Sequence, residues 1–96
     1  MEDESEEPEE GELDKHAPGY FKELWRDKAG DIHRLNGPAF TLINGELGWG
    51  SHGKYHRDDG PARIWPSTGL EEWWKNGERY EPSAHDLILW KMKKKE

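Results

Sequence analysis

The sequence predicts a mainly β protein, an antiparallel β-meander of hairpin repeats with a C-terminal helix and a disordered acidic N-terminal tail. Three observations predict this fold. The segment of residues 30–39 recurs at residues 53–62, a spacing of 23 residues. Trp25, Trp49 and Trp73 recur in phase with these copies. Asn-Gly pairs, which favour tight hairpin turns, separate short runs of strand-forming residues. A fixed internal period is the signature of a repeat architecture.

The N-terminal segment is strongly acidic. Residues 1–14 hold nine of the 21 acidic side chains and no basic one. Because such a segment has little apolar surface to offset its ordering entropy, we expect a disordered tail over residues 1–14. The remaining 12 acids and 14 bases give residues 15–96 a net charge of +2, so this single predicted domain is nearly neutral. The tail is either a solubilising segment or a mimic of a phosphate backbone.

The composition excludes several classes of protein. The chain has no cysteine, which excludes disulfides and thiolate zinc sites. No apolar run approaches the roughly 18 residues of a membrane span. The acidic N-terminus is the opposite of the basic start of a signal peptide. We therefore expect a soluble, cytoplasmic protein without membrane association.

The first repeat begins with a strand around Leu24–Asp27, because Trp25 is in phase with its later copies. Residues 39–43 are rich in strand formers and lead into the tight turn Asn44-Gly45. Residues 46–49 then return as the partner strand. A hairpin is therefore the unit that repeats.

The second repeat turns at residues 57–60. Asp59, which takes the place of Asn36 in the first copy, and Gly60 suit left-handed backbone conformations. Pro61 has no amide proton to donate, so it should begin a strand rather than lie within one. The next turn, residues 66–69, is one residue longer than its counterpart and changes the later spacing to 24 residues.

The third repeat breaks off after the tight turn Asn76-Gly77. A helix at about residues 83–94 follows, and Ser83 and Asp86 have the spacing of a capping box. We expect the helix to cover the open end or face of the sheet and to relieve an exposed strand edge. Its predicted apolar face consists of Leu87, Ile88, Leu89, Trp90 and Met92, and the cationic residues of its last turns, which complement the helix dipole, are Lys91, Lys93, Lys94 and Lys95.

The repeated motif resembles a known family. Gly-x-x-His-Arg-x-x-Gly-Pro-Ala, followed by a turn glycine, a tryptophan and Asn-Gly, is similar to the MORN-like hairpin repeats of many small bacterial and bacteriophage proteins, over about residues 25–80. The resemblance implies binding and scaffolding rather than catalysis. For a phage-encoded protein it implies an inhibitor of a host defence protein, acting in the host cytoplasm. The identical pairs are Gly30/Gly53, His33/His56, Arg34/Arg57, Gly37/Gly60, Pro38/Pro61 and Ala39/Ala62.

The candidate binding residues include the repeated pairs His33-Arg34 and His56-Arg57. In a structural interpretation each histidine bonds the turn backbone or packs beside the tryptophans, and each arginine pairs with turn carbonyls or with an acid such as Asp58. In a functional interpretation the two guanidinium groups bind an anion such as phosphate or carboxylate.

Two tryptophans are further candidates. We expect Trp25, Trp49 and Trp73 to form a buried column, one per repeat. Adjacent residues of a strand point to opposite faces, so Trp74 lies on the face away from Trp73. Trp74 and Trp65 therefore either form a partly exposed aromatic patch for a partner or pack under the helix.

The sequence lacks the residue patterns needed for metal binding, direct nucleic-acid binding and nucleophilic catalysis. His52 and His56 are separated by a turn, and no acid completes a three-ligand set, so we predict no metal site. Scattered bases on a domain of charge +2 do not form the basic footprint of direct nucleic-acid binding. The serines lie at turn or cap positions without a histidine and acid in a defensible order. We therefore predict that the protein has no catalytic residues, binds no cofactor and is not an enzyme.

Three functions stay open. The first is a non-enzymatic protein-interaction module that contacts a protein partner through exposed aromatic residues and the acidic tail. The alternative is a binder of a small anionic or nucleotide-like ligand through Arg34, Arg57 and flanking aromatics. The third is a structural building block that self-associates through a sheet edge. The sequence does not determine the oligomeric state. Arginines that converge on an open pocket would favour the ligand, and arginines bound to turn carbonyls would favour the protein partner.

Overall fold

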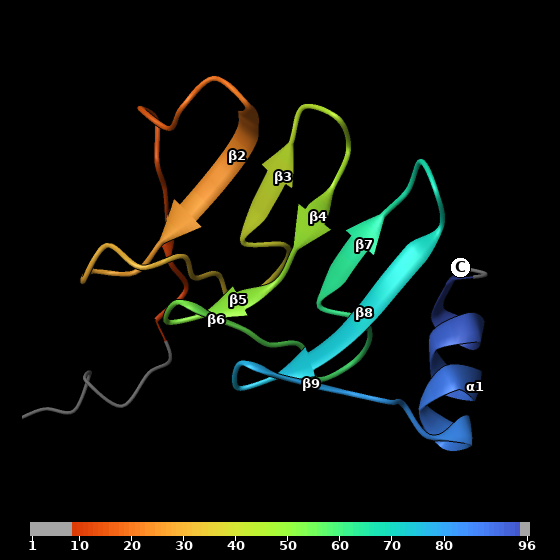
Figure 1. Ribbon diagram of the computed structural model, residues 1–96. Helices are drawn as coiled ribbons and strands as arrows, with labels where there is room; N and C mark the ends of the chain where they lie inside the picture. Colours follow the sequence, from red (N-terminus) through yellow and green to blue (C-terminus); the bar gives the residue numbers. More distant parts are fainter. Residues whose placement is uncertain (1–8, 95–96) are drawn as a thin grey trace, which may run out of the picture.

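The computed structural model describes residues 9–94 and shows a row of antiparallel strands followed by one helix (Figure 1). The predicted fold class, mainly antiparallel β with a C-terminal helix, is confirmed. In chain order the elements are β1 (Glu12–Leu13), β2 (Phe21–Arg26), β3 (Phe40–Leu42), β4 (Leu47–Gly48), β5 (Gly50–Ser51), β6 (Lys54–Tyr55), β7 (Arg63–Trp65), β8 (Leu70–Lys75), β9 (Glu78–Tyr80) and α1 (Ala84–Lys94).

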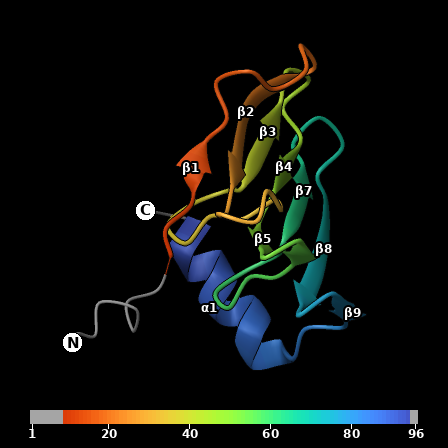
Figure 2. The ribbon, with the colours of Figure 1, turned by 90° about the vertical axis from the view of Figure 1, so that its left-hand side faces the viewer.

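The strands form a meander. Seven of them make one sheet in the order β1-β2-β3-β4-β7-β8-β9, and β5 and β6 make a second, two-stranded sheet. Only Trp49 separates β4 from β5, so one run of chain leaves the first sheet and enters the second. The view along the row of strands shows α1 to one side of the sheet (Figure 2).

The repeat in sequence is also a repeat in hydrogen bonding. The backbone N–H of Trp25 donates to the carbonyl of Ala39 (2.8 Å), and that of Trp49 donates to the carbonyl of Ala62 (2.7 Å). Both alanines are fully buried. The Gly-Pro-Ala end of each motif therefore inserts the same small residue into the same place between strands.

Two of the turns are tight and left-handed. Asn76 and Gly77 have φ angles of 51° and 83°, and His52 and Gly53 have φ angles of 49° and 87°. Positive φ at both central residues matches the twist of the flanking strands, which is why Asn-Gly is favoured in such hairpins. At the turn after β3 the positive φ belongs to Gly45.

The prediction of left-handed backbone at Asn36, Asp59 and Gly60 is wrong, because none of the three has a positive φ. Gly60 is needed for space instead. A Cβ built on it would lie 2.9 Å from the ring of Trp90 and 3.1 Å from the guanidinium carbon of Arg57. At Gly60 the glycine therefore makes room for side chains from elsewhere, whereas its copy Gly37 has a φ of 148°.

The predicted tryptophan column is only partly buried. Trp73 is 6% exposed and belongs to the core, whereas Trp25 and Trp49 are half-buried. The prediction of three equivalent core tryptophans is wrong because arginine side chains, rather than apolar ones, cover the first two rings. The buried apolar residues are Leu24, Ala39, Phe40, Ala62 and Trp73.

The predicted disordered tail is wrong for residues 9–14, and its residues 1–8 lie outside the described part of the chain. The backbone carbonyl of Glu9 accepts a hydrogen bond from His33 Nε2 (2.6 Å), and the carbonyl of Glu10 accepts one from the Leu35 amide (3.0 Å). β1 then pairs with β2. The segment is ordered because it completes the hydrogen bonding of the first repeat, despite its acidic composition.

The helix begins as predicted. The Asp86 amide donates to Ser83 Oγ (3.1 Å), and the Ser83 amide donates to Asp86 Oδ2 (3.0 Å), which is a reciprocal capping box. Its apolar side does not cover the sheet as expected, because only the Trp90 side chain packs closely against it. No residue of α1 is buried, and its exposed apolar residues are Leu87, Ile88, Leu89 and Met92.

Replacement of Ser83 with alanine should weaken α1 specifically. Loss of an N-cap hydroxyl costs about 1 kcal/mol of helix stability. We expect faster amide hydrogen exchange over Ala84–Lys94 and unchanged exchange in β2 and β8. Ser67→Ala, at a turn position, is the matched control. Unchanged exchange in α1 would show that the cap does not hold the helix.

Candidate functional site

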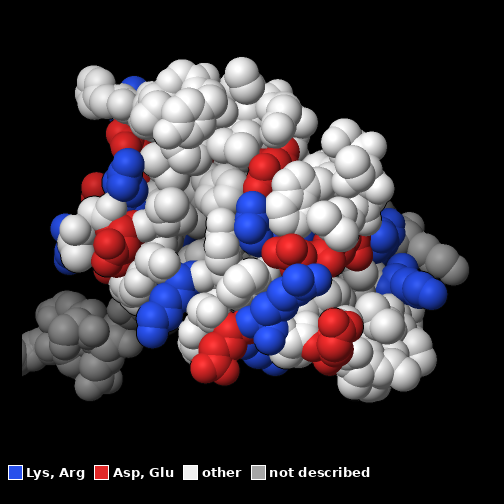
Figure 3. Space-filling model, viewed as in Figure 1, with Lys and Arg blue, Asp and Glu red and all other residues white. Residues whose placement is uncertain are grey.

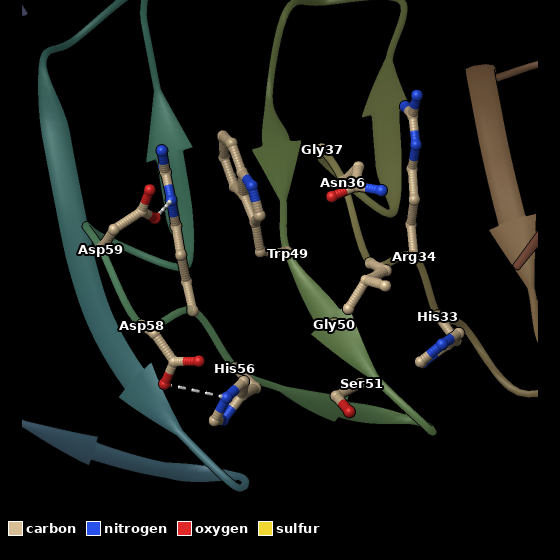
Figure 4. A pocket seen from close by; sticks show the side chains of 12 residues that line it. His33, Arg34, Asn36, Gly37, Trp49, Gly50, Ser51, His56, Asp58 and Asp59 are labelled. Atoms are coloured by element: carbon tan, nitrogen blue, oxygen red, sulfur yellow. Dashed lines mark hydrogen bonds and ion pairs between the residues drawn. The ribbon is translucent and has the colours of Figure 1, made fainter. Parts of the chain in front are cut away.

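The two repeated loops face each other across one groove of about 580 Å³, which lies in the range of roughly 300–1,000 Å³ typical of ligand sites. It is lined by residues 33–37 of the first loop, residues 56–59 of the second and residues 49–51 between them, and we call it the repeat groove. Figure 4 shows His33 and Arg34 on one wall and His56 on the other. The structure therefore brings both His-Arg pairs together.

Both arginines stack on tryptophans. The guanidinium carbon of Arg34 lies 3.9 Å from the ring centroid of Trp25, and that of Arg57 lies 3.8 Å from the ring centroid of Trp49. A cation over an indole face contributes about 0.5–2 kcal/mol, depending on its desolvation. These stacks explain why arginine and tryptophan recur together in each repeat.

The guanidinium groups are also bound to the loop backbone. Arg34 Nη1 donates to the Pro38 carbonyl (3.4 Å), and Arg57 Nη1 donates to the Pro61 carbonyl (3.1 Å). Arg57 Nε further pairs with Asp59 (2.9 Å), where Asp58 had been suggested. The geometry of the structural interpretation is thus present in both repeats, although both side chains also line the repeat groove.

The two histidines perform the same task. The Nδ1 atom of His33 accepts a hydrogen bond from the His52 amide (3.0 Å), and the Nδ1 atom of His56 accepts one from the Asn76 amide (3.0 Å). His33 is 4% exposed, and its Nε2 atom donates to the Glu9 carbonyl. Each imidazole therefore joins its own loop to the left-handed turn of the following repeat.

A second polar cluster, which the sequence did not suggest, adjoins His33. The His52 ring stacks on His33 at a centroid distance of 4.1 Å, and its Nδ1 atom donates to Asp27 Oδ2 at 2.6 Å. The Asp27 carboxylate also accepts from the Asp31 amide (2.9 Å). Mainly because of the His52 hydrogen bond, the pKa of Asp27 is lowered from its usual value of 3.8, against the opposing effect of burial.

This cluster predicts acid sensitivity. Because the pKa of Asp27 is lower when folded than when unfolded, its ionised form stabilises the fold above about pH 4, and this stabilisation is lost as the pH falls through the folded pKa. We expect the melting temperature of Asp27→Asn to change less between pH 5 and 3 than that of the wild type. The exposed Asp31→Asn variant is the control. Equal slopes for both variants would remove Asp27 from the acid response.

The structure places Trp65 and Trp74 on one face of the β7–β8 hairpin, at its two ends. Trp65 pairs with Leu70 at the turn end of the β7–β8 hairpin, whereas Trp74 pairs with Arg79 at the far end of β8. Both are half-buried. Trp74 packs against Tyr55 at 5.2 Å, and Trp65 lies beneath a guanidinium group. Arg63 stacks on both Trp65 and Tyr55, so the two tryptophans belong to one partly exposed row, and its use as a surface for a partner stays a prediction. Packing of these two rings under α1 is wrong, because Trp90 of α1 meets Trp73 on the opposite face.

Trp90 is the aromatic residue whose position the sequence did not indicate. Its ring meets Trp73 edge to face at 6.5 Å, and the guanidinium carbon of Arg57 lies 4.9 Å from its centroid. Its indole N–H donates to Glu71 (3.4 Å). Trp90 is thus the aromatic contact between α1 and the second repeat, beside the ion pairs of Lys93 with Asp59 and of Lys94 with Glu71.

The surface charge is mixed on the face that Figure 3 shows, where basic and acidic side chains alternate below largely uncharged hairpin tips. Within residues 9–94, no three histidine or acidic side chains are placed to hold a metal ion. No helix of the described chain has the length and apolar character needed to cross a membrane.

The fold and the groove define a class: a β-hairpin repeat protein whose repeated His-Arg loops face one another. Comparison with protein-family models, with curated proteins and with solved structures found no match to this chain. The resemblance to MORN-like repeats stays a prediction.

Proposed function

We propose that this protein is a non-enzymatic module that binds a protein partner. The proposal rests on one observation: α1 presents four apolar side chains that are each 40–61% exposed. Ile88 is 56% exposed and Met92 is 61% exposed. Contiguous exposed apolar side chains commonly mark protein interfaces. We call the exposed apolar residues of α1 the helix face: Leu87, Ile88, Leu89 and Met92.

The helix face is continuous with the repeat groove. A hollow of about 360 Å³ lies between α1 and the second loop, and Leu89, Met92, Asp58 and Asp59 line it. The same two aspartates line the repeat groove on the other side of that loop. A partner could thus rest on the helix face and reach across the loop. That such a partner belongs to a host defence system is a further proposal, supported only by the resemblance of the repeats.

The alternative, a binder of a small anionic ligand, is favoured by the placement of Arg34 and Arg57 in the same groove. The surroundings of these arginines weigh against it. Arg57 already pairs with Asp59, and the Asp58 carboxylate stands on the rim with 80% of its side chain exposed. These acids would repel a phosphate, so we place the protein partner first.

The experiment is a capture from host lysate with the tagged full-length chain, read by mass spectrometry. We expect one partner to be retained by the wild type and reduced about tenfold by the double substitution Ile88→Glu and Met92→Glu. Ile43→Glu, at an apolar residue that is 70% exposed on a distant hairpin turn, should retain the partner.

Two results would contradict the proposal. One is equal capture by the wild type and the double variant. The other is no partner in any sample together with a self-associated wild type in size-exclusion chromatography that the double variant abolishes. The latter would assign the helix face to contacts between copies of this chain.

A further inference from the structure

The second repeat contains a slot that an aromatic side chain fills. Its walls are Arg57 and Trp73, and its floor is Gly60. Trp90 occupies it, at 4.9 Å from the guanidinium carbon and 6.5 Å from the Trp73 ring. A Cβ on Gly60 would lie 2.9 Å from the Trp90 ring, so the glycine makes room for the indole. We call this arrangement the second slot.

The first repeat has the same walls and floor. The repeat places Arg34 at the position of Arg57, Gly37 at that of Gly60 and Trp49 at that of Trp73. All three line the repeat groove. Figure 4 shows Trp49 and Arg34 on opposite sides of the opening, with Asn36 and Gly37 between them. We call this arrangement the first slot.

The first slot differs from the second in its contents. The atoms nearest to a Cβ on Gly37 belong to the Arg34 guanidinium group, at 3.1 Å, with no aromatic ring among them. Within the described chain, Arg57 meets two tryptophan rings, whereas Arg34 meets one, that of Trp25. The groove that remains is the large cavity of about 580 Å³.

We propose that the first slot receives a tryptophan side chain from a basic segment of the partner protein. The inference rests on the proposed function and specifies the partner's chemistry. An indole there would lie against the Arg34 guanidinium and Trp49, as Trp90 lies against Arg57 and Trp73. A guanidinium group is attracted to the electron-rich face of an indole. An aromatic ring packs favourably against an indole in an edge-to-face arrangement.

The charge on the rim explains why the segment is basic. At the second slot, Lys93, three residues after the inserted tryptophan, pairs with Asp59 at 3.3 Å. At the first slot Asn36 takes the place of Asp59, and the carboxylate on the rim is that of Asp58, which lies 3.2 Å from His56 Nε2. A lysine or arginine near the partner's tryptophan would pair with this carboxylate, whereas the carboxylate would repel a phosphate.

The chain's own helix supplies a probe. An acetylated, fluorescein-labelled peptide of residues 83–94 carries the tryptophan and its lysines. We would titrate it with the full-length protein by fluorescence anisotropy, beside a peptide with Trp90→Ala. We expect saturable binding of the first peptide and about tenfold weaker binding of the second.

Protein variants locate the binding. Asp58→Lys reverses a charge on the rim of the first slot, and Glu78→Lys makes the same change on exposed β9. We expect about threefold or greater weakening for Asp58→Lys and no change for Glu78→Lys. Full peptide binding by Asp58→Lys, with tighter binding to protein carrying Trp90→Ala, would show displacement of α1 from the second slot and overturn the proposal.

Three other outcomes would overturn it. These are equal binding of both peptides, absence of saturable binding to the wild type, and displacement of the peptide by ATP, which would assign the groove to a small anionic ligand. If no peptide binds while the lysate partner is still lost with the helix-face substitutions, the proposed function stands and the first slot is excluded. If neither binds, both fail.

Discussion

Replacing Trp90 with alanine should detach α1 from the sheet and lower the free energy of unfolding by about 2–3 kcal/mol, somewhat less than the loss of a fully buried tryptophan. The reason is that α1 has no buried residue and meets the second repeat chiefly through this ring. Removal of the indole also leaves Trp73 and the Arg57 stack open to water. An 11-residue helix without such an anchor is marginal in water.

Urea unfolding followed by tryptophan fluorescence would measure the loss, and far-UV circular dichroism would report the helix. Ile88→Ala, on the exposed side of the same helix, is the control and should change stability by less than about 0.5 kcal/mol. If Trp90→Ala keeps the wild-type helix signal and urea midpoint, the polar contacts of Glu71 and Asp59 with α1 would have to hold it instead.

Much of the fold could be predicted because its signals are local. Tight turns, strand formers and the Ser83–Asp86 box act over a few residues, and the period then multiplies each local signal into a meander. The strand predicted at Leu24–Asp27 from the phase of Trp25 overlaps β2, which begins three residues earlier and ends at Arg26. In a repeat protein, a segment with a weak secondary-structure signal can thus be assigned from copies whose signal is stronger.

What could not be predicted depends on contacts between distant segments. The acidic residues 9–14 are ordered because the carbonyls of Glu9 and Glu10 accept hydrogen bonds from His33 and Leu35 of the first loop. Composition favoured disorder and carried no information about these contacts. The packing of Trp90 also depends on a distant segment. Its ring lies against Gly60, which is 30 residues earlier in the chain.

The sequence identified residues of the candidate site but not how their side chains are arranged. The period identified His33, Arg34 and their copies as equivalent, and the structural interpretation foresaw their bonds to turn backbone. It did not foresee that each arginine stacks on the tryptophan at the start of its own repeat. The sequence period shows which positions of the two repeats are equivalent. It does not show which side chain lies opposite on a neighbouring strand, because that depends on how the strands are aligned.

Gly48→Ala should be the most damaging small substitution in the sheet, with an expected loss of about 3 kcal/mol, at the upper end for overpacking. Gly48 pairs with Phe40, and a Cβ on it would lie 2.3 Å from two atoms of that ring. Its φ is not positive, so the cost is steric. Phe40 is buried and also contacts Phe21 and Tyr55, so the ring cannot simply move away.

The measurement is the urea midpoint of Gly48→Ala beside that of Gly19→Ala. An added Cβ at Gly19 meets nothing within 4 Å, and that variant should be neutral or slightly more stable because alanine restricts the unfolded chain. Combining Gly48→Ala with Phe40→Leu tests the cause. If the ring is the obstacle, the double variant loses less stability than the two single variants summed. Additive losses would place the strain of Gly48→Ala in the backbone of β4 and not against Phe40.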